Sequence, residues 1–309
     1  MEEDKCMKRL FIIVFTLVLA VLLGTGLAYP ALAAGSAPVA ENLELRTFKN
    51  VSVNGQLSAF DPENDVVKYQ ICTQPVKGRI ELATDGSFVY TPAMDKKGKD
   101  YFGYKAIDAE GNSSQEATVI IRIDKQKKGV SYSDMKGSGG EYAALLLSEE
   151  DVFTGEQICG EYCFYPDRAV TRGEFLSMCM IVADEPVISA VMNTGYSDDE
   201  DIPDWMKPYV TATVMKGMDS PDSGSLGRCF QPEASITRAE AVTMLNQALG
   251  LNDVNYIQLD AALQPELAQA CANLTASGII RDGTPVEETM SRMDAAELLS
   301  KALELMSRR

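Results

Sequence analysis

Three arginines stand at the same place in three similar segments of the chain. The segments are Thr171-Arg172-Gly173-Glu174, Thr237-Arg238-Ala239-Glu240 and Ser291-Arg292-Met293-Asp294. In each, the hydroxyl residue is the predicted N-cap of a helix and the acidic residue completes a capping box. An arginine at the first helical position faces the positive end of the helix dipole, which is unfavourable by about 0.3–1 kcal/mol unless compensated. Each arginine therefore has either an internal carboxylate partner or an anionic ligand, which neighbouring backbone N–H groups would help to hold.

Apolar residues follow each segment at helical spacing and form the predicted core of the C-terminal half. The three segments lie too far apart for a single helical repeat, which indicates a small helical module used three times. The predicted core residues are Leu176, Cys179, Ala183, Val242, Leu245, Ala248, Leu249, Ala296, Leu299 and Leu303.

Composition excludes several classes of function. The chain has 309 residues, long enough for two domains, and no histidine. Histidine-type metal sites, Ser-His-Asp triads and Cys-His pairs are therefore excluded. A net charge of −17 argues against nucleic acid and anionic membrane surfaces as partners. A carboxylate pair would still suit a glycan hydrolase, but the predicted domains are small for that chemistry, so we expect no enzyme.

The N-terminus resembles an export signal. Basic residues precede the apolar stretch 10–23, and Ala31-Leu32-Ala33 offers a cleavage pattern, which predicts a signal peptide over residues 1–33. The alternative is an uncleaved anchor, because residues 10–28 almost span a bilayer. The membrane is then a partner only through this segment.

Six cysteines would remain after cleavage. Cys72, Cys179 and Cys271 lie in apolar runs and are expected to be small core residues. Cys159 and Cys163 are close enough for a local disulfide, and the sequence leaves that pairing open.

Residues 37–123 alternate short apolar runs with turn residues, the pattern of a β-sandwich. The stretch from Asp85-Gly86 to Thr91-Pro92, then Gly98 to Tyr104 and Asp108, resembles the bacterial Ig-like or cadherin-like repeats of surface proteins. The resemblance implies an all-β Ig-like sandwich that serves as a spacer or adhesive module, with a target that the sequence does not name. The predicted strands are 66–71, 79–82, 87–91, 101–107 and 117–123.

Acidic residues alternate in one loop of this module and recur in another. Asp61, Glu63, Asp65 and Asp108 are hard oxygen ligands of the kind that hold Ca²⁺. The same residues also favour turns for backbone reasons alone. Calcium is the one cofactor that we consider; otherwise none is expected.

A charged stretch, residues 124–129, is the predicted linker, solvated by default although its lysines would suit an anionic wall polymer. Three helical copies follow, which we call copy 1 (130–190), copy 2 (191–252) and copy 3 (253–309). The starts are Tyr132-Ser133-Asp134, Tyr196-Ser197-Asp198 and, less clearly, residues 256–260.

Copy 2 carries the fullest set of features. It runs from Tyr196-Ser197-Asp198 through Trp205, Gly217 and Phe230-Gln231-Pro232 to the helix start at Thr237. This pattern resembles the S-layer homology (SLH) domain. The resemblance implies an all-α, pseudo-threefold SLH trimer in which one helix of each copy joins a central bundle and grooves form between adjacent copies.

The resemblance also implies ligand-binding residues. In copy 2 these are Arg238, Trp205, Gly217 and Asp198, with arginine meeting a ligand carboxylate and tryptophan facing a sugar ring or packing in the core. Arg172 and Asp134 match in copy 1, and Arg292 and Gly278 match in copy 3. The position of Trp205 is occupied by Gly139 in copy 1 and by Glu266 in copy 3. The position of Gly217 is occupied by Asp151 in copy 1.

SLH domains bind secondary cell-wall polymers, often through a pyruvylated amino sugar, or modified peptidoglycan. The resemblance therefore implies a secreted, non-enzymatic protein of the cell wall or S-layer surface that displays the Ig-like module. An adhesion or interaction protein and a structural S-layer component are the alternatives.

Overall fold

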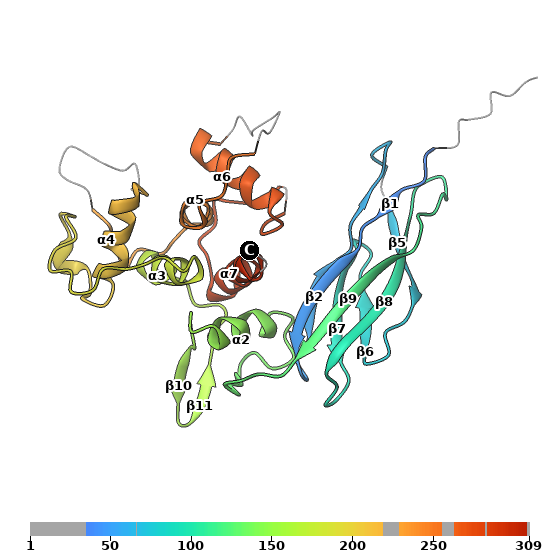
Figure 1. Cartoon of the computed structure of the whole chain (residues 1–309), viewed down its shortest axis with the longest axis horizontal. Helices are drawn as coiled ribbons and strands as arrows, with labels where there is room; N and C mark the ends of the chain where they lie inside the picture. The colour runs from blue at the N-terminus through green and yellow to red at the C-terminus, as the bar shows by residue number, and fades with distance from the viewer. Residues whose placement is uncertain (1–34, 66, 219–228, 255–262, 282, 308–309) are drawn as a thin grey trace, which may run out of the picture.

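The computed structural model describes residues 35–65, 67–218, 229–254, 263–281 and 283–307. A β-sandwich comes first and a helical region follows it, as the sequence predicted (Figure 1). The predicted signal peptide and the start of copy 3 at 256–260 lie outside the described residues. Among the helices that are described, none is long and apolar enough to cross a membrane.

The sandwich is built from two main sheets. One has the order β2-β9-β8-β5 and the other β3-β7-β6, with β1 paired to β4. β2 runs parallel to β9, which places a parallel pair at the edge of an otherwise antiparallel sheet. The strands are β1 Val39–Ala40, β2 Leu43–Phe48, β3 Val53–Gln56, β4 Ala59–Phe60, β5 Lys68–Thr73, β6 Gly78–Leu82, β7 Ser87–Pro92, β8 Gly98–Ile107 and β9 Ala117–Asp124.

Each predicted strand appears within a few residues of its expected place, whereas β1 to β4 were missed. Alternation explains the success, because every second residue of β7 and β9 is buried. The two sheets meet in the core, where the rings of Phe88 and Phe102 lie edge to face at 5.3 Å. Tyr90 donates a hydrogen bond from its hydroxyl to Asp100 at 2.7 Å, so this buried polar group is satisfied.

Within the described residues, each copy contributes two α-helices, and copy 2 also has the short 3-10 helix η1 Asp199–Asp201. All three predicted capping boxes are present: the side chains of Thr171, Thr237 and Ser291 accept from the N3 backbone, and the N3 carboxylates accept from the N-cap backbone. A short hairpin, β10 Glu156–Ile158 and β11 Glu161–Cys163, extends from copy 1. The helices are α2 Glu141–Glu149, α3 Arg172–Val182, α4 Lys207–Lys216, α5 Arg238–Leu249, α6 Pro265–Ala276 and α7 Arg292–Met306.

Helices pack across copies. α3 packs against α4, α5 against α6, and α7 against α2, so the second helix of each copy lies against the first helix of the next. α3 also packs against both α5 and α7. We call the contact of α3 with α4 junction 1–2, that of α5 with α6 junction 2–3, and that of α7 with α2 junction 3–1.

Backbone hydrogen bonds link the three copies in a closed ring. Val170 donates to the carbonyl of Met290, Met290 to that of Ile236, and Ile236 to that of Val170, each at 3.0 Å. Each of these residues precedes a capping box by one position, so the ring ties the three helix starts together.

The predicted core of the helical region is buried, except that Leu303 is only partly buried. Cys179 is buried as expected, but Cys72 is exposed on β5 and Cys271 is only partly buried. The expectation for Cys72 was wrong because its side chain falls on the solvent side of the strand. Cys159 lies in the turn of the hairpin, and both Cys159 and Cys163 are free thiols in the structure.

The predicted linker is held against the helical region. The backbone N–H groups of Lys127 and Lys128 donate to the carboxylate of Glu149 at 2.8 and 2.9 Å. The β-sandwich also contacts α2, because the rings of Phe48 and Tyr142 lie 5.4 Å apart. Lys125, Lys127 and Lys128 are exposed, as expected of a solvated linker, although the backbone is hydrogen-bonded to Glu149. Buried residues of the two halves belong to one packed cluster.

Candidate functional site: the arginines between the copies

Each arginine of the three helix starts reaches into the next copy. Arg172 Nη1 donates to Glu240 Oε1 at 2.6 Å across junction 1–2. Arg238 Nη2 donates to Asp294 Oδ1 at 2.9 Å across junction 2–3. Both acceptors are the N3 residues of the next capping box, so a carboxylate compensates each cation at the positive end of its helix.

These two carboxylates therefore have two functions. One oxygen of Glu240 closes the capping box with Thr237, and the other meets Arg172. Asp294 does the same with Ser291 and Arg238. Burial works to raise the pKa of Asp294, but the hydrogen bonds from Ser291 and the charge of Arg238 outweigh it and hold the pKa below its usual value.

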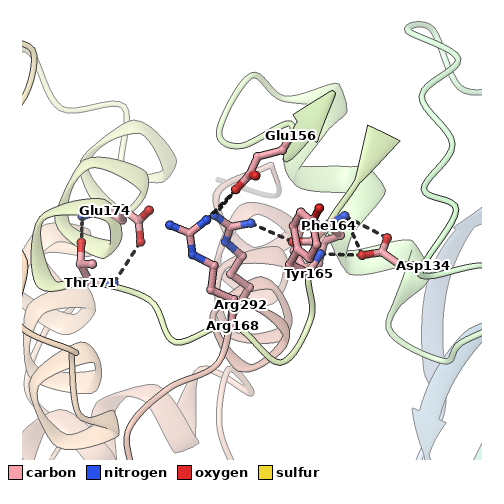
Figure 2. Close-up of polar contacts among 8 residues, drawn as sticks. All are labelled: Asp134, Glu156, Phe164, Tyr165, Arg168, Thr171, Glu174 and Arg292. Atoms are coloured by element: carbon pink, nitrogen blue, oxygen red, sulfur yellow. Dashed lines mark hydrogen bonds and ion pairs between the residues drawn. The ribbon is translucent and has the colours of Figure 1, made fainter. Parts of the chain in front are cut away.

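Junction 3–1 is arranged differently. Arg292 donates from Nη2 to Glu156 Oε1 at 3.2 Å and from Nη1 to the carbonyl of Phe164 at 3.0 Å. Arg168 donates to the same carboxylate oxygen of Glu156 at 2.6 Å. Figure 2 shows the two guanidinium groups side by side below Glu156, while Glu174 closes its own capping box with Thr171.

Backbone N–H groups at the helix starts are already used. Arg172 and Gly173 donate to the carbonyls of Ala234 and Pro232. In the second helix start, Arg238 donates to the carbonyl of Glu288 and Ala239 to that of Val286. In the third, Arg292 donates to the carbonyl of Arg168 and Met293 to that of Pro166. An external anion therefore finds side-chain donors here, and the expected help from free backbone N–H groups is not available at these positions.

Asp134 and Asp198 shape the loop before each second helix. Asp134 accepts backbone hydrogen bonds from Phe164 and Tyr165, at 2.7 to 3.0 Å (Figure 2). Asp198 accepts in the same way from Phe230 and Gln231, at 2.8 and 2.7 Å. Both carboxylates are thus engaged by the protein itself. These hydrogen bonds fix the positions of Phe164 and Phe230, the aromatic residues of the two loops.

The segment that carries Trp205 approaches the start of α3 in copy 1. The next residue, Met206, is buried, and its Sδ lies 2.2 Å from the place where a Cβ on Gly173 would stand. The guanidinium carbon of Arg172 also lies 5.7 Å from the ring centre of Phe230 in copy 2. Junction 1–2 therefore brings Met206 and Phe230 of copy 2 against the start of α3 in copy 1.

Trp205 is 57% exposed. Packing in the core, one of its two expected roles, is therefore excluded. An exposed indole face at a junction between copies is suited to stacking against a sugar ring.

Gly217 and Gly278 have left-handed backbone conformations. Their φ angles are 68° and 73°, and a Cβ at either position would meet nothing within 4 Å. Glycine is therefore favoured at both positions by the left-handed backbone conformation, and not by the close approach of a neighbouring atom. Asp151 adopts φ 58° at the corresponding place in copy 1, which agrees with the alignment of the copies.

The positions that correspond to Trp205 are occupied differently in the other copies. At Gly139 a Cβ would stand 2.2 Å from the side chain of Asn54 of the β-sandwich. Glu266 accepts a hydrogen bond from Gln247 at 2.6 Å. Among the residues with described structure, copy 2 alone presents an aromatic side chain at this position.

Two side-chain N–H groups remain without a partner. They are Nε of Arg172 and Nε of Arg238, both buried. Each is a donor that folding has removed from water without replacing its hydrogen bond. The guanidinium groups of junctions 1–2 and 2–3 thus retain donor capacity.

Sequence reasoning missed Glu156 and Arg168. Both are placed by the β10–β11 hairpin and the loop after it. A Cys-Gly pair with both residues at positive φ forms the hairpin turn. No motif marked this stretch in the sequence, because its length equals that of the corresponding stretch of copy 2.

The acidic loops of the sandwich lie at one end of the module. Asp61 Oδ1 accepts from the N–H groups of Glu63 and Asp65, as turn residues do. The neighbouring Asp65 carboxylate raises the pKa of Glu110, and Oδ2 of Asp61 is buried without a partner. Asp108 holds its own turn through Asn112. Within the described residues, no group of three potential ligands is arranged to hold a metal.

Two families match this chain. Residues 35–125 match the bacterial cadherin-like domain, and residues 195–242 match the S-layer homology domain. The chain carries a bacterial cadherin-like domain and an SLH domain. The SLH match covers most of copy 2, the copy with the fullest set of motifs. Both domains point to a non-enzymatic protein, in agreement with the sequence prediction.

A curated relative is the cellulosome-anchoring protein of Acetivibrio thermocellus, which is 25% identical over 164 residues. The match covers 52% of this chain but only 34% of that relative. Among solved structures, the sialic acid binding region of the Streptococcus sanguinis SK1 adhesin is 12% identical, with a TM-score of 0.24 over 32% of this chain and 31% of that one.

Two further solved structures show the range of these similarities. An endo-fucoidan hydrolase of glycoside hydrolase family 107 is 20% identical, with a TM-score of 0.24 over 30% of this chain and 14% of that one. Titin domain M7 is 14% identical, with a TM-score of 0.21 over 29% of this chain and 96% of that one. Scores this low carry no argument about function.

Proposed function

We propose that this is a secreted surface protein that attaches non-covalently to the bacterial cell wall through its SLH region and displays the cadherin-like module. The SLH match in copy 2 is the observation that carries the proposal. The relative named as a cellulosome-anchoring protein supports it, since anchoring is the activity in that protein's name. Export is required by the proposal and rests on the signal pattern of residues 1–33.

The SLH region is proposed to be a pseudo-threefold trimer of copies 1, 2 and 3. The closed ring of backbone hydrogen bonds supports this arrangement, as does the packing of each second helix on the next copy. The matching left-handed residues Asp151, Gly217 and Gly278 give further support. In this arrangement α3, α5 and α7 form the central bundle, and the junctions are the ligand grooves.

The ligand proposed is an anionic secondary wall polymer that bears a carboxylate, such as a pyruvylated sugar, or else modified peptidoglycan. Junction 1–2 offers an exposed indole for the sugar ring and the spare Nε donor of Arg172 for the anion. Junction 2–3 offers Arg238 with the same spare donor. A ligand carboxylate would share or replace the contacts to Glu240 and Asp294.

Trp205→Ala tests the proposal with little risk to the fold. Because the side chain is more than half exposed, its removal should leave the melting temperature nearly unchanged. If the indole stacks on a sugar, binding to purified wall sacculi should weaken by about 1–2 kcal/mol, which is roughly 5- to 30-fold. Binding is measured by sedimentation of the chain with sacculi over a concentration series.

Met94→Ala is the matched control. Met94 is 83% exposed on the cadherin-like module, so the variant loses an exposed apolar group outside the three helical copies. It should bind sacculi as the unmodified chain does. Equal binding by Trp205→Ala and Met94→Ala would exclude junction 1–2 as the main site. Sacculi stripped of non-peptidoglycan polymer distinguish the two proposed ligands.

A structural role in a surface lattice and a role as an adhesin are the alternatives. Phe60, Val76 and Met94 are exposed on the cadherin-like module, which would suit an adhesive surface. Electron microscopy decides the first alternative, because an ordered two-dimensional array of the purified protein would favour a lattice component.

Calcium remains a proposal for the acidic end of the sandwich. Oδ2 of Asp61 is a buried oxygen without a partner, and the Asp65 carboxylate lies close enough to raise the pKa of Glu110. Since the described residues form no coordination set, the loops would have to rearrange to bind the ion.

A further inference from the structure

Junction 3–1 holds an anion that belongs to the protein. The carboxylate of Glu156 lies between the guanidinium groups of Arg168 and Arg292 and accepts from both, at 2.6 and 3.2 Å (Figure 2). Glu156 belongs to the β10–β11 hairpin, and the capping box of Thr171 and Glu174 takes no part in this contact. At the other two junctions, the N3 carboxylate of the next capping box, Glu240 or Asp294, accepts from the arginine instead.

Arg292 is the most buried of the three arginines. Its side chain is 5% exposed, against 14% for Arg172 and 23% for Arg238. The guanidinium also lies 4.9 Å from the ring centre of Phe153 and donates to a backbone carbonyl. Unlike the other two, it does not have an unpartnered buried Nε.

The space beside Arg292 is too small for a sugar. A cavity lined by Phe153, Phe164, Glu174 and Arg292 measures about 10 Å³. That volume holds about one water molecule at most. A monosaccharide would have to displace the side chains that line this cavity.

The cadherin-like module covers the same side of copy 1. Asn54 of β3 fills the space above Gly139, the position that corresponds to Trp205. Gly140, one residue on, receives Met293 of copy 3, whose Sδ stands 2.2 Å from the place of a Cβ. Copy 1 therefore has no side chain at the position that corresponds to Trp205, and Met293 of copy 3 fills the space beside Gly140.

We propose that Glu156 is a built-in substitute for the ligand carboxylate, which seals junction 3–1 and restricts wall binding to junctions 1–2 and 2–3. The inference rests on the proposed wall-binding function. Glu156 is then a specificity-determining residue, because it satisfies two cations that would otherwise form an anion site. The same contact ties the third copy to the first.

Glu156→Gln tests the substitution directly. The amide keeps the size of the side chain and removes its charge, which leaves Arg168 and Arg292 without a compensating anion. Inorganic phosphate is the probe, measured by calorimetric titration of the whole chain. The variant should bind phosphate at least about tenfold more tightly than the unmodified chain.

The double variant Glu156→Gln with Arg168→Gln is the matched control. Arg168 is half exposed, so its loss should not disturb the fold, and the gain in phosphate affinity should disappear. A folded Glu156→Gln variant without a gain would overturn the proposal, and so would a gain that survives the loss of Arg168. Circular dichroism establishes that both variants are folded.

Sacculus binding provides the second measurement. Arg168→Gln should bind sacculi within about twofold of the unmodified chain, because junction 3–1 is sealed, whereas a loss of about tenfold or more would contradict the sealing. If the unmodified chain does not bind sacculi, the proposed function fails. The phosphate titration still decides whether Glu156 acts as an internal anion.

Discussion

The ion pair between Arg238 and Asp294 should couple copy 2 to copy 3 by about 1 kcal/mol. The pair is charged and well aligned at 2.9 Å, for which full desolvation would give about 1.5–3 kcal/mol. Arg238 is 23% exposed and Asp294 is 32% exposed, so solvent screens part of this energy. Fully exposed pairs give about 0.2–1 kcal/mol, and the expected coupling lies between the two ranges.

A double-mutant cycle measures this coupling. Arg238→Met keeps the apolar stem of the side chain, and Asp294→Asn keeps an oxygen for the Ser291 cap. The four proteins are unfolded in urea and followed by circular dichroism in the helical region of the spectrum. The coupling should fall in about 1 M salt, where the screening length is only about 3 Å.

Arg79 and Glu81 provide the control pair. They lie 3.2 Å apart on the cadherin-like module, but their side chains are 72% and 68% exposed. A cycle on this pair, followed by tyrosine fluorescence, should give about 0–0.3 kcal/mol. If the Arg238–Asp294 coupling is no larger than this, the carboxylate does not compensate the cation at the helix start. The reasoning about the macrodipole would then be refuted.

Two further predictions concern charge. Hydrogen bonds from Lys207 and then Thr194 lower the pKa of Asp199 to about 2, so its contribution to stability should be present above about pH 4 and lost as the pH falls through 2. The difference in unfolding free energy between the unmodified chain and Asp199→Asn should therefore shrink over that interval in urea titrations; a constant difference would contradict it. If the acidic loops bind Ca²⁺, titration of the whole chain should raise the melting temperature of the sandwich, and Asp61→Asn should abolish the effect. An equal response to Ca²⁺ and Mg²⁺ would argue for charge screening alone.

Local features of the fold were readable from the sequence. The capping boxes were predicted correctly because N-cap and N3 are three residues apart, and their hydrogen bonds form within one helical turn. The helical core was predicted because periodicity records which face is buried. Strands β5 to β9 were found for the same reason, whereas β1 to β4 are short or contain polar and glycine residues that obscure the alternation.

The failures share one physical cause. Cys72 lies in an apolar run, but the side of the strand that faces the core depends on the partner strand. The parallel pairing of β2 with β9 and the docking of residues 124–129 on α2 likewise depend on contacts between segments far apart in the chain. Neither spacing nor propensity records such contacts.

The sequence by itself determined that Arg172, Arg238 and Arg292 begin three capped helices and that each cation needs an anion. Only the tertiary structure decided which anion each one meets. The partners lie 68, 56 and 136 residues away, because each copy is completed by the next around a closed ring. The tertiary structure also placed Arg172 against the ring of Phe230 and Arg292 against Glu156. Dipoles and caps act within a helical turn, whereas ion pairs between packed helices depend on the arrangement of the whole chain.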